Sequence, residues 1–368
     1  MKILSVTIMP PKNDAQWTRI SNIAKFLEKK GFEISIVHYI LKGGKSYKDI
    51  KKESINGLII TTNPFSIFFK HIKILKKGEY DLVYGNTYAS TFFCILSKLI
   101  SKKPIILDMH GISEEYDFTE NSLLFSFAMK FMEKNALLFA DKVLCVSHEM
   151  TNYLNCKKKV PLEKLFYVPN GVDLDFFRQI DDHYVNMLKK KYKIEDKLIF
   201  GYLGGAQKWQ GMEKFISTCE KITDEKFMAI IVGCNIPSIT IDGNIIYIPF
   251  VKKDEIINYY SLCDVLVLPR PKHIVTDVAA PTKFAEYVSM GKPVLVTDVG
   301  DAAKLVKKYE NGIVVKDNKV ENLKKGINDF LKLKRDKLNQ MGLNSRKLAE
   351  KEFDWNNIIN YLSEILES

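Results

Sequence analysis

PTKFAEYVSMGKPVLVTDVG, residues 281–300, combines a helix, a stop signal, a buried strand and a turn within twenty positions. The apolar spacing predicts an amphipathic helix that ends at the Gly-Lys-Pro of 291–293, followed by a strand over 293–297 and a turn at 298–301. A helix leading into a buried strand is typical of a parallel sheet. Open α/β sheets bind ligands at the carboxyl edge of their strands, so we expect this helix to carry side chains to that edge.

Short apolar runs alternate with helical patterns along the rest of the chain. The predicted strands are 3–8, 33–38, 58–61, 82–84, 105–109, 142–146 and 166–168 in a first series, and 198–202, 229–232, 245–248, 265–268, 293–297 and 312–315 in a second. Alternating strands and helices predict parallel sheets with helices on both faces. The expected fold class is therefore α/β, with two doubly wound Rossmann-like domains.

The length of 368 residues exceeds one ordinary core and fits two domains. The polar stretch 170–182 separates the two series of strands. We predict one domain over residues 1–172, joined by the last helix at about 354–368, and a second over 173–353.

The charge is unevenly distributed. Lys and Arg total 55 against 44 Asp and Glu, a net charge of +11, and residues 41–77 hold nine lysines but only two acids. A basic surface favours anionic partners. The pattern over 64–77, PFSIFFKHIKILKK, fits a helix lying on an anionic membrane, but such a helix more often packs on its own sheet and exposes its lysines.

Cysteine spacing and the amino terminus indicate the compartment. The six cysteines are scattered and form no C-x-x-C or Cys/His ligand pattern, so no metal site is expected and a reducing cytoplasm suits them. Met1 leads directly into a strand, which predicts no signal peptide. The apolar run 121–140 carries three charges, too many to span a bilayer. The expected localisation is cytoplasmic, with the inner face of the membrane as a peripheral site.

Two side chains of the opening stretch suggest its chemistry. The carboxylate of Glu286 can accept two hydrogen bonds from a vicinal diol such as a ribose. Lys283 precedes it by about one helical turn and can meet a phosphate from the same face. A diol acceptor beside a phosphate donor predicts a nucleotide-sugar site, whereas the alternative is an ordinary solvated Lys–Glu pair.

A glycine-rich loop and a histidine offer further candidates. Residues 201–211, GYLGGAQKWQG, end a strand and open a helix, so Gly204 and Gly205 can let the backbone approach a phosphate, with Lys208 as the nearest cation. The loop lacks the G-x-G-x-x-G and Walker spacings, which argues against a dehydrogenase. His110 follows the strand 105–109, where it is either a capped loop residue or a hydrogen-bond donor to a ligand.

Several of these segments resemble one family. EYVSMGKPV at 286–294 resembles the E-A/Y-M-A-x-G-x-P-V signature of retaining glycosyltransferases with the GT-B fold, family 4 (the glycogen-synthase-like group). VPNGVD at 168–173 resembles the string at their interdomain crossing, and FDW at 353–355 their last helix. The resemblance implies two domains facing each other across a cleft. It also implies metal-independent transfer of a hexose-like sugar from a nucleoside-diphosphate donor to a hydroxyl, with retention and without a cofactor.

The resemblance also implies roles for individual residues. The first domain would be the acceptor side and the second the donor side. His110 would contact the donor sugar, Lys208 and Lys283 the diphosphate, and Glu286 the ribose. PTKFAEY fits a family subset with P-x-K-x-x-E-Y. We expect the donor to be bound by Gly204 and Gly205 of the glycine-rich loop, and by a donor loop with Asp277, Ala279 and Ala280 that leads into Pro281 and Thr282.

The chain departs from the family pattern at three places. Tyr202 stands where an Arg is expected, Gln210 where a Lys is usual, and Val278 where a first glutamate is usual. The first loop, MPPKNDAQW at 9–17, has prolines in place of glycines. The expected acceptor contacts, for a glycan, a lipid-linked or a small-molecule acceptor, are Asn13, Asp14 and Arg19.

Two other functions fit parts of the sequence. A nucleotide-sugar epimerase can use the same two-domain architecture and would consume donor without an acceptor. A non-catalytic binder of nucleic acid or of an anionic membrane would use the basic face. The basic run lacks aromatic residues arranged for base stacking, so no nucleic-acid partner is expected.

Overall fold

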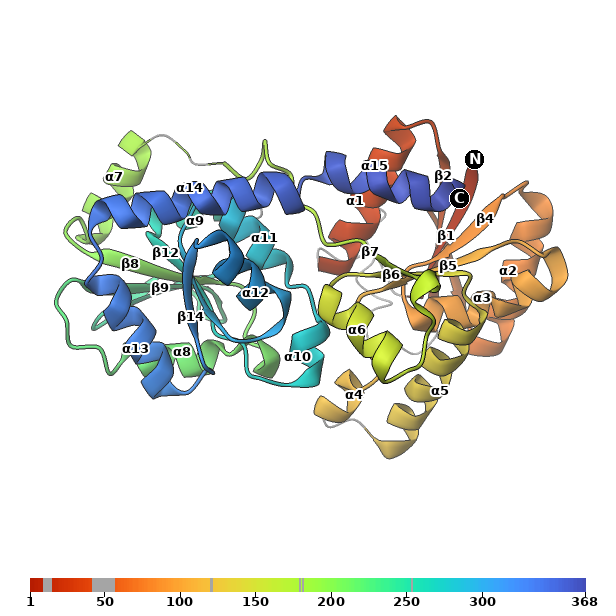
Figure 1. Ribbon diagram of the computed structural model, residues 1–368, viewed down its shortest axis with the longest axis horizontal. Helices are drawn as coiled ribbons and strands as arrows, with labels where there is room; N and C mark the ends of the chain where they lie inside the picture. The colour runs from red at the N-terminus through yellow and green to blue at the C-terminus, as the bar shows by residue number, and fades with distance from the viewer. Residues whose placement is uncertain (9–14, 42–56, 120–121, 179, 181, 253) are drawn as a thin grey trace. The chain divides into compact units, whose positions relative to one another are not determined.

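The computed structural model describes residues 1–8, 15–41, 57–119, 122–178, 180, 182–252 and 254–368 (Figure 1). These residues form two compact units. The first comprises Met1–Pro169 and Ile358–Ser368, and the second Asn170–Asn357. The predicted domain boundaries lie three and four residues from these positions.

The first unit is built on a parallel sheet of seven strands in the order β3-β2-β1-β4-β5-β6-β7. The strands are β1 (Lys2–Thr7), β2 (Glu33–Leu41), β3 (Gly57–Thr62), β4 (Leu82–Gly85), β5 (Ile105–Met109), β6 (Lys142–Cys145) and β7 (Leu165–Tyr167). The helices are α1 (Ala15–Lys29), α2 (Pro64–Lys77), α3 (Tyr88–Ser101), α4 (Glu115–Phe118), α5 (Leu123–Phe139), α6 (His148–Cys156), the 3-10 turn η2 (Leu162–Lys164) and most of α15 (Trp355–Glu367).

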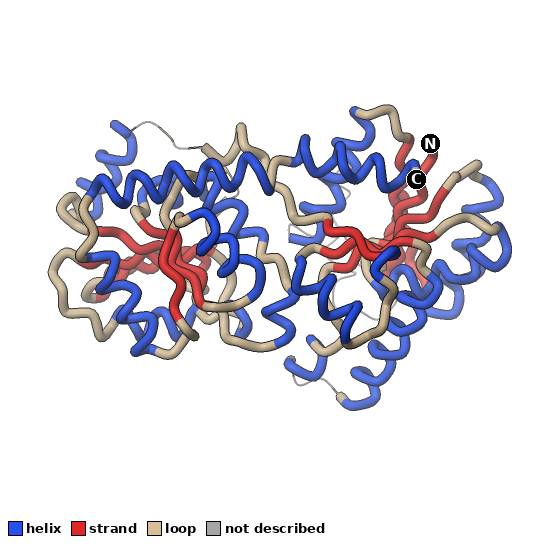
Figure 2. The backbone as a smooth tube through the Cα atoms, in the orientation of Figure 1, coloured by secondary structure: helices blue, strands red, loops and turns tan. Residues whose placement is uncertain are grey.

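Both faces of this sheet are apolar, as the near-continuous Val/Ile/Leu runs predict. Leu4 and Val6 of β1 pack in one cluster with Ile67 of α2 and Phe93 of α3. In a separate cluster, Ile20 of α1 packs against Ile36 of β2. Figure 2 shows the strands of each unit flanked by helices.

The second unit has the sheet order β10-β11-β9-β8-β12-β13-β14. The strands are β8 (Leu198–Leu203), β9 (Phe227–Cys234), β10 (Thr240–Asp242), β11 (Ile245–Pro249), β12 (Val265–Leu268), β13 (Val294–Thr297) and β14 (Gly312–Val315). The helices are α7 (Asp182–Tyr192), η3 (Lys208–Gln210), α8 (Met212–Cys219), α9 (Ile256–Leu262), α10 (Ile274–Val278), α11 (Thr282–Ser289), α12 (Gly300–Tyr309), α13 (Val320–Leu331) and α14 (Arg335–Glu352).

Alternate residues of the central strands enter two separate cores. Ile230 and Val232 of β9 pack in the cluster that α9, α11 and α12 complete. Ala229 and Ile231 pack in the cluster of α8 and α13. Two doubly wound, Rossmann-like units are therefore present, as the sequence predicts.

The basic helix predicted over 64–77 is α2, and it packs on its own sheet. Ile67 and His71 are buried, while Phe69 is 75% exposed. Lys73, Lys76 and Lys77 are exposed as well. Among the described residues, no helix has the length and apolar character needed to cross a bilayer.

Candidate functional site

The second sheet reverses its winding direction at its centre. β8 pairs with β9 on one side and with β12 on the other, so the switch point lies between β8 and β12. Doubly wound sheets bind ligands at this point, outside the carboxyl ends of the strands. Gly204 and Gly205 follow β8 there, and Arg270 follows β12. We call Tyr202, Gly204, Tyr260, Arg270, Lys283 and Glu286 the carboxyl-edge site.

Lys283 extends from the first turn of α11 toward the end of β8. Its Nζ lies 3.2 Å from the hydroxyl oxygen of Tyr202 and 4.6 Å from the centre of the Tyr202 ring. A Cβ at position 204 would lie 2.3 Å from that Nζ. Glycine at this position therefore leaves room for the lysine amine, which agrees with its positive φ of 141°.

The Lys283 amine lies in a site that disfavours its positive charge. Burial, together with the nearby Arg270 guanidinium, lowers the pKa of Lys283 to about 7, although Glu286 acts in the opposite direction. An anion placed beside Lys283 and Arg270 would favour the charged form. The pair is thus suited to a phosphate.

Glu286 is half-buried and accepts a hydrogen bond of 2.6 Å from the Tyr260 hydroxyl through Oε2. Burial and the Glu286 carboxylate raise the pKa of Tyr260 well above its usual value, so the hydroxyl keeps its proton and donates. Tyr287, the next residue of α11, contacts the end of β8 through its hydroxyl, which accepts from the Leu203 amide at 3.2 Å. These contacts fix the helix that carries Lys283 and Glu286 against the sheet.

Arg270 is a cation of this site that the sequence reasoning missed. Its side chain is buried, and its Nη1 donates to the Thr276 carbonyl at 3.4 Å. The sequence did contain a signal, because Leu268-Pro-Arg-Pro places a cation two residues after a buried parallel strand.

The predicted donor loop runs from the end of α10, which contains Asp277, to the start of α11. Asp277 Oδ1 accepts a hydrogen bond of 3.1 Å from the Gly300 amide, at the start of α12. The Ala280 carbonyl accepts one of 2.7 Å from Asn170. Ala279, Pro281 and Thr282 are all half-buried, and Thr282 begins α11. Lys208 begins the short η3 turn and is exposed.

A buried ion cluster occupies the end of β5 in the first unit. The Asp108 carboxylate accepts hydrogen bonds from Arg19 at 2.9 Å and from the Tyr84 hydroxyl at 2.8 Å. His110 Nε2 lies 3.1 Å from Asp108 Oδ2. Burial alone would raise the pKa of Asp108, but Arg19 and His110 hold it well below its usual range.

This cluster corrects the prediction for Arg19. The side chain is 2% exposed, and its remaining donors bind the Val168 and Pro169 carbonyls at 3.0 and 2.8 Å. A guanidinium bonded in this way holds the end of the first unit together and is buried away from any acceptor. Asn13 and Asp14, the other predicted acceptor contacts, lie outside the described residues.

Each unit matches a family model. Residues 16–176 match the model described as Glycosyltransferase Family 4, and residues 186–348 the model described as Glycosyl transferases group 1. These matches support a glycosyltransferase with the GT-B fold. The resemblance predicted from the sequence agrees with these matches as far as a glycosyltransferase with the GT-B fold.

Proteins that resemble the whole chain also include glycosyltransferases. The uncharacterized glycosyltransferase MJ1178 of Methanocaldococcus jannaschii is 22% identical over 381 residues, covering 100% of this chain and 98% of that protein. Anabaena Alr3699/HepE, solved in complex with UDP, has a TM-score of 0.79 at 18% identity, with 100% of both chains covered. Sucrose-phosphate synthase of Thermosynechococcus elongatus has a TM-score of 0.76 at 17% identity, covering 100% of this chain and 98% of that one. The solved structures share the fold.

Proposed function

We propose that this glycosyltransferase moves a sugar from a nucleoside-diphosphate donor to a hydroxyl acceptor, with retention and without a metal. The observation that carries the proposal is the carboxyl-edge site, where a lysine of lowered pKa, a buried arginine and a carboxylate meet at the switch point. The Anabaena relative, which was solved with UDP, supports a uridine donor.

The donor would lie across the start of α11. Lys283, Arg270 and the amides at the helix start would stabilise the charge that develops on the leaving diphosphate. The backbone of Gly204 and Gly205 and of 277–282 would line the phosphates, with Lys208 as a further cation. Glu286 would accept hydrogen bonds from the ribose hydroxyls.

We keep the prediction that His110 contacts the donor sugar. Its Nε2 lies 3.1 Å from Oδ2 of the buried Asp108 carboxylate. Retention is proposed from the 281–294 signature. For this reaction the protein mainly positions the reactants and stabilises the leaving group.

Donor binding tests the proposal through three glutamine variants. UDP and UDP-glucose should raise the melting temperature of the wild-type protein by mass action. Lys283→Gln and Glu286→Gln should each reduce that shift, Lys208→Gln should reduce it less, and the exposed control Lys214→Gln should leave it unchanged. A full shift in both Lys283→Gln and Glu286→Gln would contradict the assigned site.

Product analysis separates the competing activities. NMR of the product anomer should show the configuration of the donor, and inversion would contradict retention. Conversion of the nucleotide sugar into another nucleotide sugar without acceptor would favour an epimerase.

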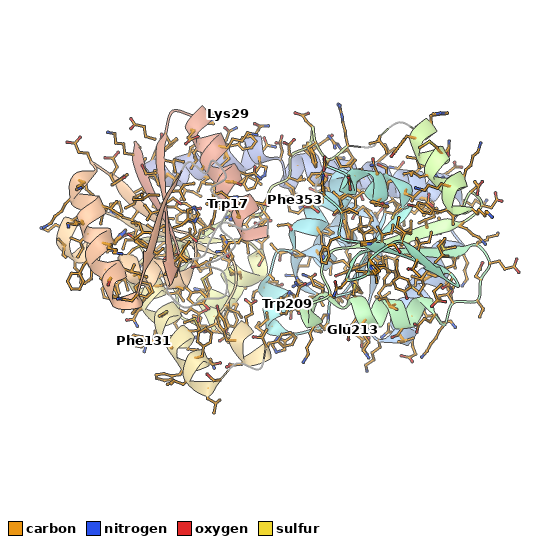
Figure 3. The ribbon with its side chains drawn as sticks, turned by 180° about the vertical axis from the view of Figure 1, so that it is seen from behind. Trp17, Lys29, Phe131, Trp209, Glu213 and Phe353 are labelled. Carbon is orange, nitrogen blue, oxygen red and sulfur yellow. The ribbon has the colours of Figure 1, made fainter. Side chains whose placement is uncertain are left out.

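We also propose that the first unit docks on an anionic membrane, through what we call the α5 face. The exposed large apolar side chains gathered there belong to α5 and the end of α3: Leu123, Leu124, Phe127, Phe131, Leu138, Leu99 and Ile100. Phe131, labelled in Figure 3, is 53% exposed. Lys134 is exposed on the same helix, which suits anionic headgroups.

Vesicle sedimentation tests the docking proposal. The protein should bind vesicles of phosphatidylglycerol and not of phosphatidylcholine, with binding reduced by salt. A Phe127→Ser, Phe131→Ser double variant should lose binding. The control Phe250→Ser, which removes a side chain 71% exposed in the second unit, should retain it. Equal binding by both variants would contradict the α5 face.

A further inference from the structure

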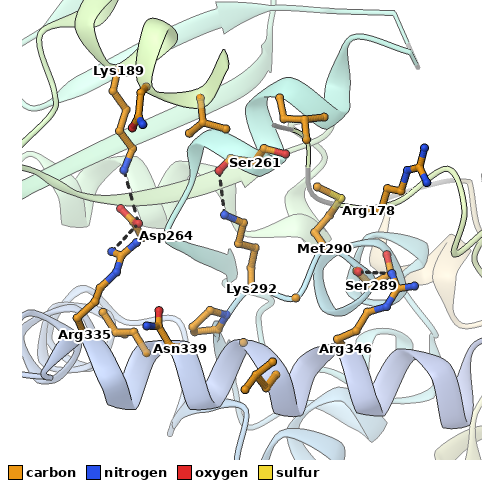
Figure 4. Close-up of a pocket in the computed structure, with 18 residues that line it drawn as sticks. Arg178, Lys189, Ser261, Asp264, Ser289, Met290, Lys292, Arg335, Asn339 and Arg346 are labelled. Atoms are coloured by element: carbon orange, nitrogen blue, oxygen red, sulfur yellow. Dashed lines mark hydrogen bonds and ion pairs between the residues drawn. The ribbon is translucent and has the colours of Figure 1, made fainter. Parts of the chain in front are cut away.

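A cavity lies at the amino edge of the second sheet, opposite the edge that carries the carboxyl-edge site. Its volume is about 780 Å³, within the range of small-molecule pockets. Asp264 and Pro293, which directly precede β12 and β13, line it (Figure 4). We call it the amino-edge cavity.

One wall is a single face of α14. Arg335, Leu338, Asn339, Gly342, Leu343 and Arg346 line the cavity, and their spacing of three and four residues places them on one side of the helix. Gly342 permits the close approach of that helix, because a Cβ there would lie 2.5 Å from the Gly291 carbonyl oxygen. The opposite wall comes from α7 and α9.

The lining is strongly basic. It contains five cationic side chains, Arg178, Lys189, Lys292, Arg335 and Arg346, and one carboxylate, Asp264. Arg335 and Lys189 both pair with Asp264, at 3.1 and 3.7 Å. Arg346 is used structurally, since it donates to the Ser289 and Phe177 carbonyls at 2.8 and 3.0 Å. The single carboxylate of Asp264 therefore pairs with two cations, and the lining of the cavity keeps an excess of positive charge.

Lys292 and Ser261 add a polar pair beside the ion pairs. Lys292 Nζ donates to the Ser261 carbonyl at 2.8 Å, and burial lowers the pKa of Lys292. The Ser261 hydroxyl is buried, the residue being 4% exposed, and it has no hydrogen-bond partner within the described part of the chain.

We propose that the amino-edge cavity binds a small metabolite carrying a dianionic phosphate group. Lys292 and Arg335 would bind the phosphate oxygens, and Lys189 would add its charge. The volume exceeds that of a bare phosphate ion, which favours a phosphate ester over inorganic phosphate.

Isothermal titration with glucose 6-phosphate and with inorganic phosphate tests this site. The wild-type protein should bind the ester more tightly than the free ion. Lys292→Gln and Arg335→Gln should each weaken ester binding at least tenfold. Lys337→Gln makes the same charge change on α14 at an exposed residue outside the lining and should bind as the wild type does.

Two further measurements complete the test. Melting temperatures without ligand show whether each variant is folded, and Arg335→Gln decides the matter if Lys292→Gln fails to fold, because Arg335 is 66% exposed. Lys283→Gln separates the two edges of the sheet and should leave ester binding unchanged. No ester binding by the wild-type protein, equal binding by Arg335→Gln and Lys337→Gln, or loss in Lys283→Gln alone would overturn the proposal.

Discussion

At the scale of single residues, the first unit contrasts a buried ion pair with an exposed one. Arg19 and Asp108 are 2% and 0% exposed. Arg19 also donates to the Val168 and Pro169 carbonyls, and Asp108 also accepts from the Tyr84 hydroxyl. Lys130 and Asp117 form a pair of similar length, 2.6 Å, with both side chains 45% exposed. Burial removes the water that would otherwise compensate a lost partner.

Arg19→Met should therefore destabilise the protein by about 3–5 kcal/mol, because it leaves the Asp108 carboxylate buried without its cation. Lys130→Met, the matched control, should cost much less, because water screens an exposed pair. Urea unfolding followed by circular dichroism measures both. Similar losses for the two variants would contradict the structural role assigned to Arg19.

Lys283 should make stability depend on pH. Its pKa of about 7 in the folded protein lies below the ordinary value of 10.5, so between these values the unfolded chain binds more protons. The Lys283 contribution should then make the protein more stable as pH rises from about 7 toward about 10. Urea unfolding at several pH values should show a smaller rise in Lys283→Gln. An unchanged pH profile in this variant would contradict the lowered pKa.

The sequence identified Lys283 and Glu286 because they belong to one helix with fixed spacing. It missed Arg270 and Tyr260 because they reach the carboxyl-edge site from other elements, and only the sheet order brings β12 beside β8. Arg19 was assigned the wrong role for a related reason. Its partner Asp108 is 89 residues away, and nothing local indicates the pairing.

At the scale of elements, the buried strands were predictable and the exposed ones were not. β10 was missed because it is three residues long, wholly exposed and antiparallel to β11, so it lacks an apolar run. Residues 320–352, whose apolar spacing is helical throughout, form two helices, α13 and α14. No Gly or Pro marks the break at 332–334, where Leu333 packs against the core of the second unit.

Two glycines allow backbone strain to be separated from packing. Both have positive φ, 76° at Gly211 and 55° at Gly243. A Cβ at 211 would lie 1.8 Å from the Pro269 carbonyl oxygen, whereas nothing lies within 4 Å at 243. Gly243→Ala should cost about 1–2 kcal/mol, the cost of a left-handed residue. Gly211→Ala should cost clearly more, and equal losses in urea unfolding would contradict the close approach of η3 to the end of β12.

At the scale of the whole molecule, the first unit is discontinuous in sequence. Residues 358–368 return to it after the second unit is complete. The residues of α15 that are buried there are Ile358, Ile359, Leu362, Ile365 and Leu366. Lys142 of β6 donates to Ser368 at 2.6 Å. The last eleven residues thus form part of the core of the first unit.

A chain that ends at Asn357 should lose most of the stability of its first unit. Each buried Ile or Leu contributes about 1.5–3 kcal/mol, and the five together approach the whole stability of a domain. Limited proteolysis with mass spectrometry should show cuts throughout 1–169 and protection of 170–357. Removing only 367–368, which are exposed, is the control. Equal protection of both units in the shortened chain would contradict this account.

The return of α15 also sets an order for synthesis. Everything that the second unit needs has been translated once residue 357 is made, whereas the half that leaves the ribosome first still lacks its final helix. Domains generally mature from the amino terminus during translation. Here the nascent chain should fold in the opposite order, with the second unit before the first. The first unit, which is translated first, should then depend longest on chaperones.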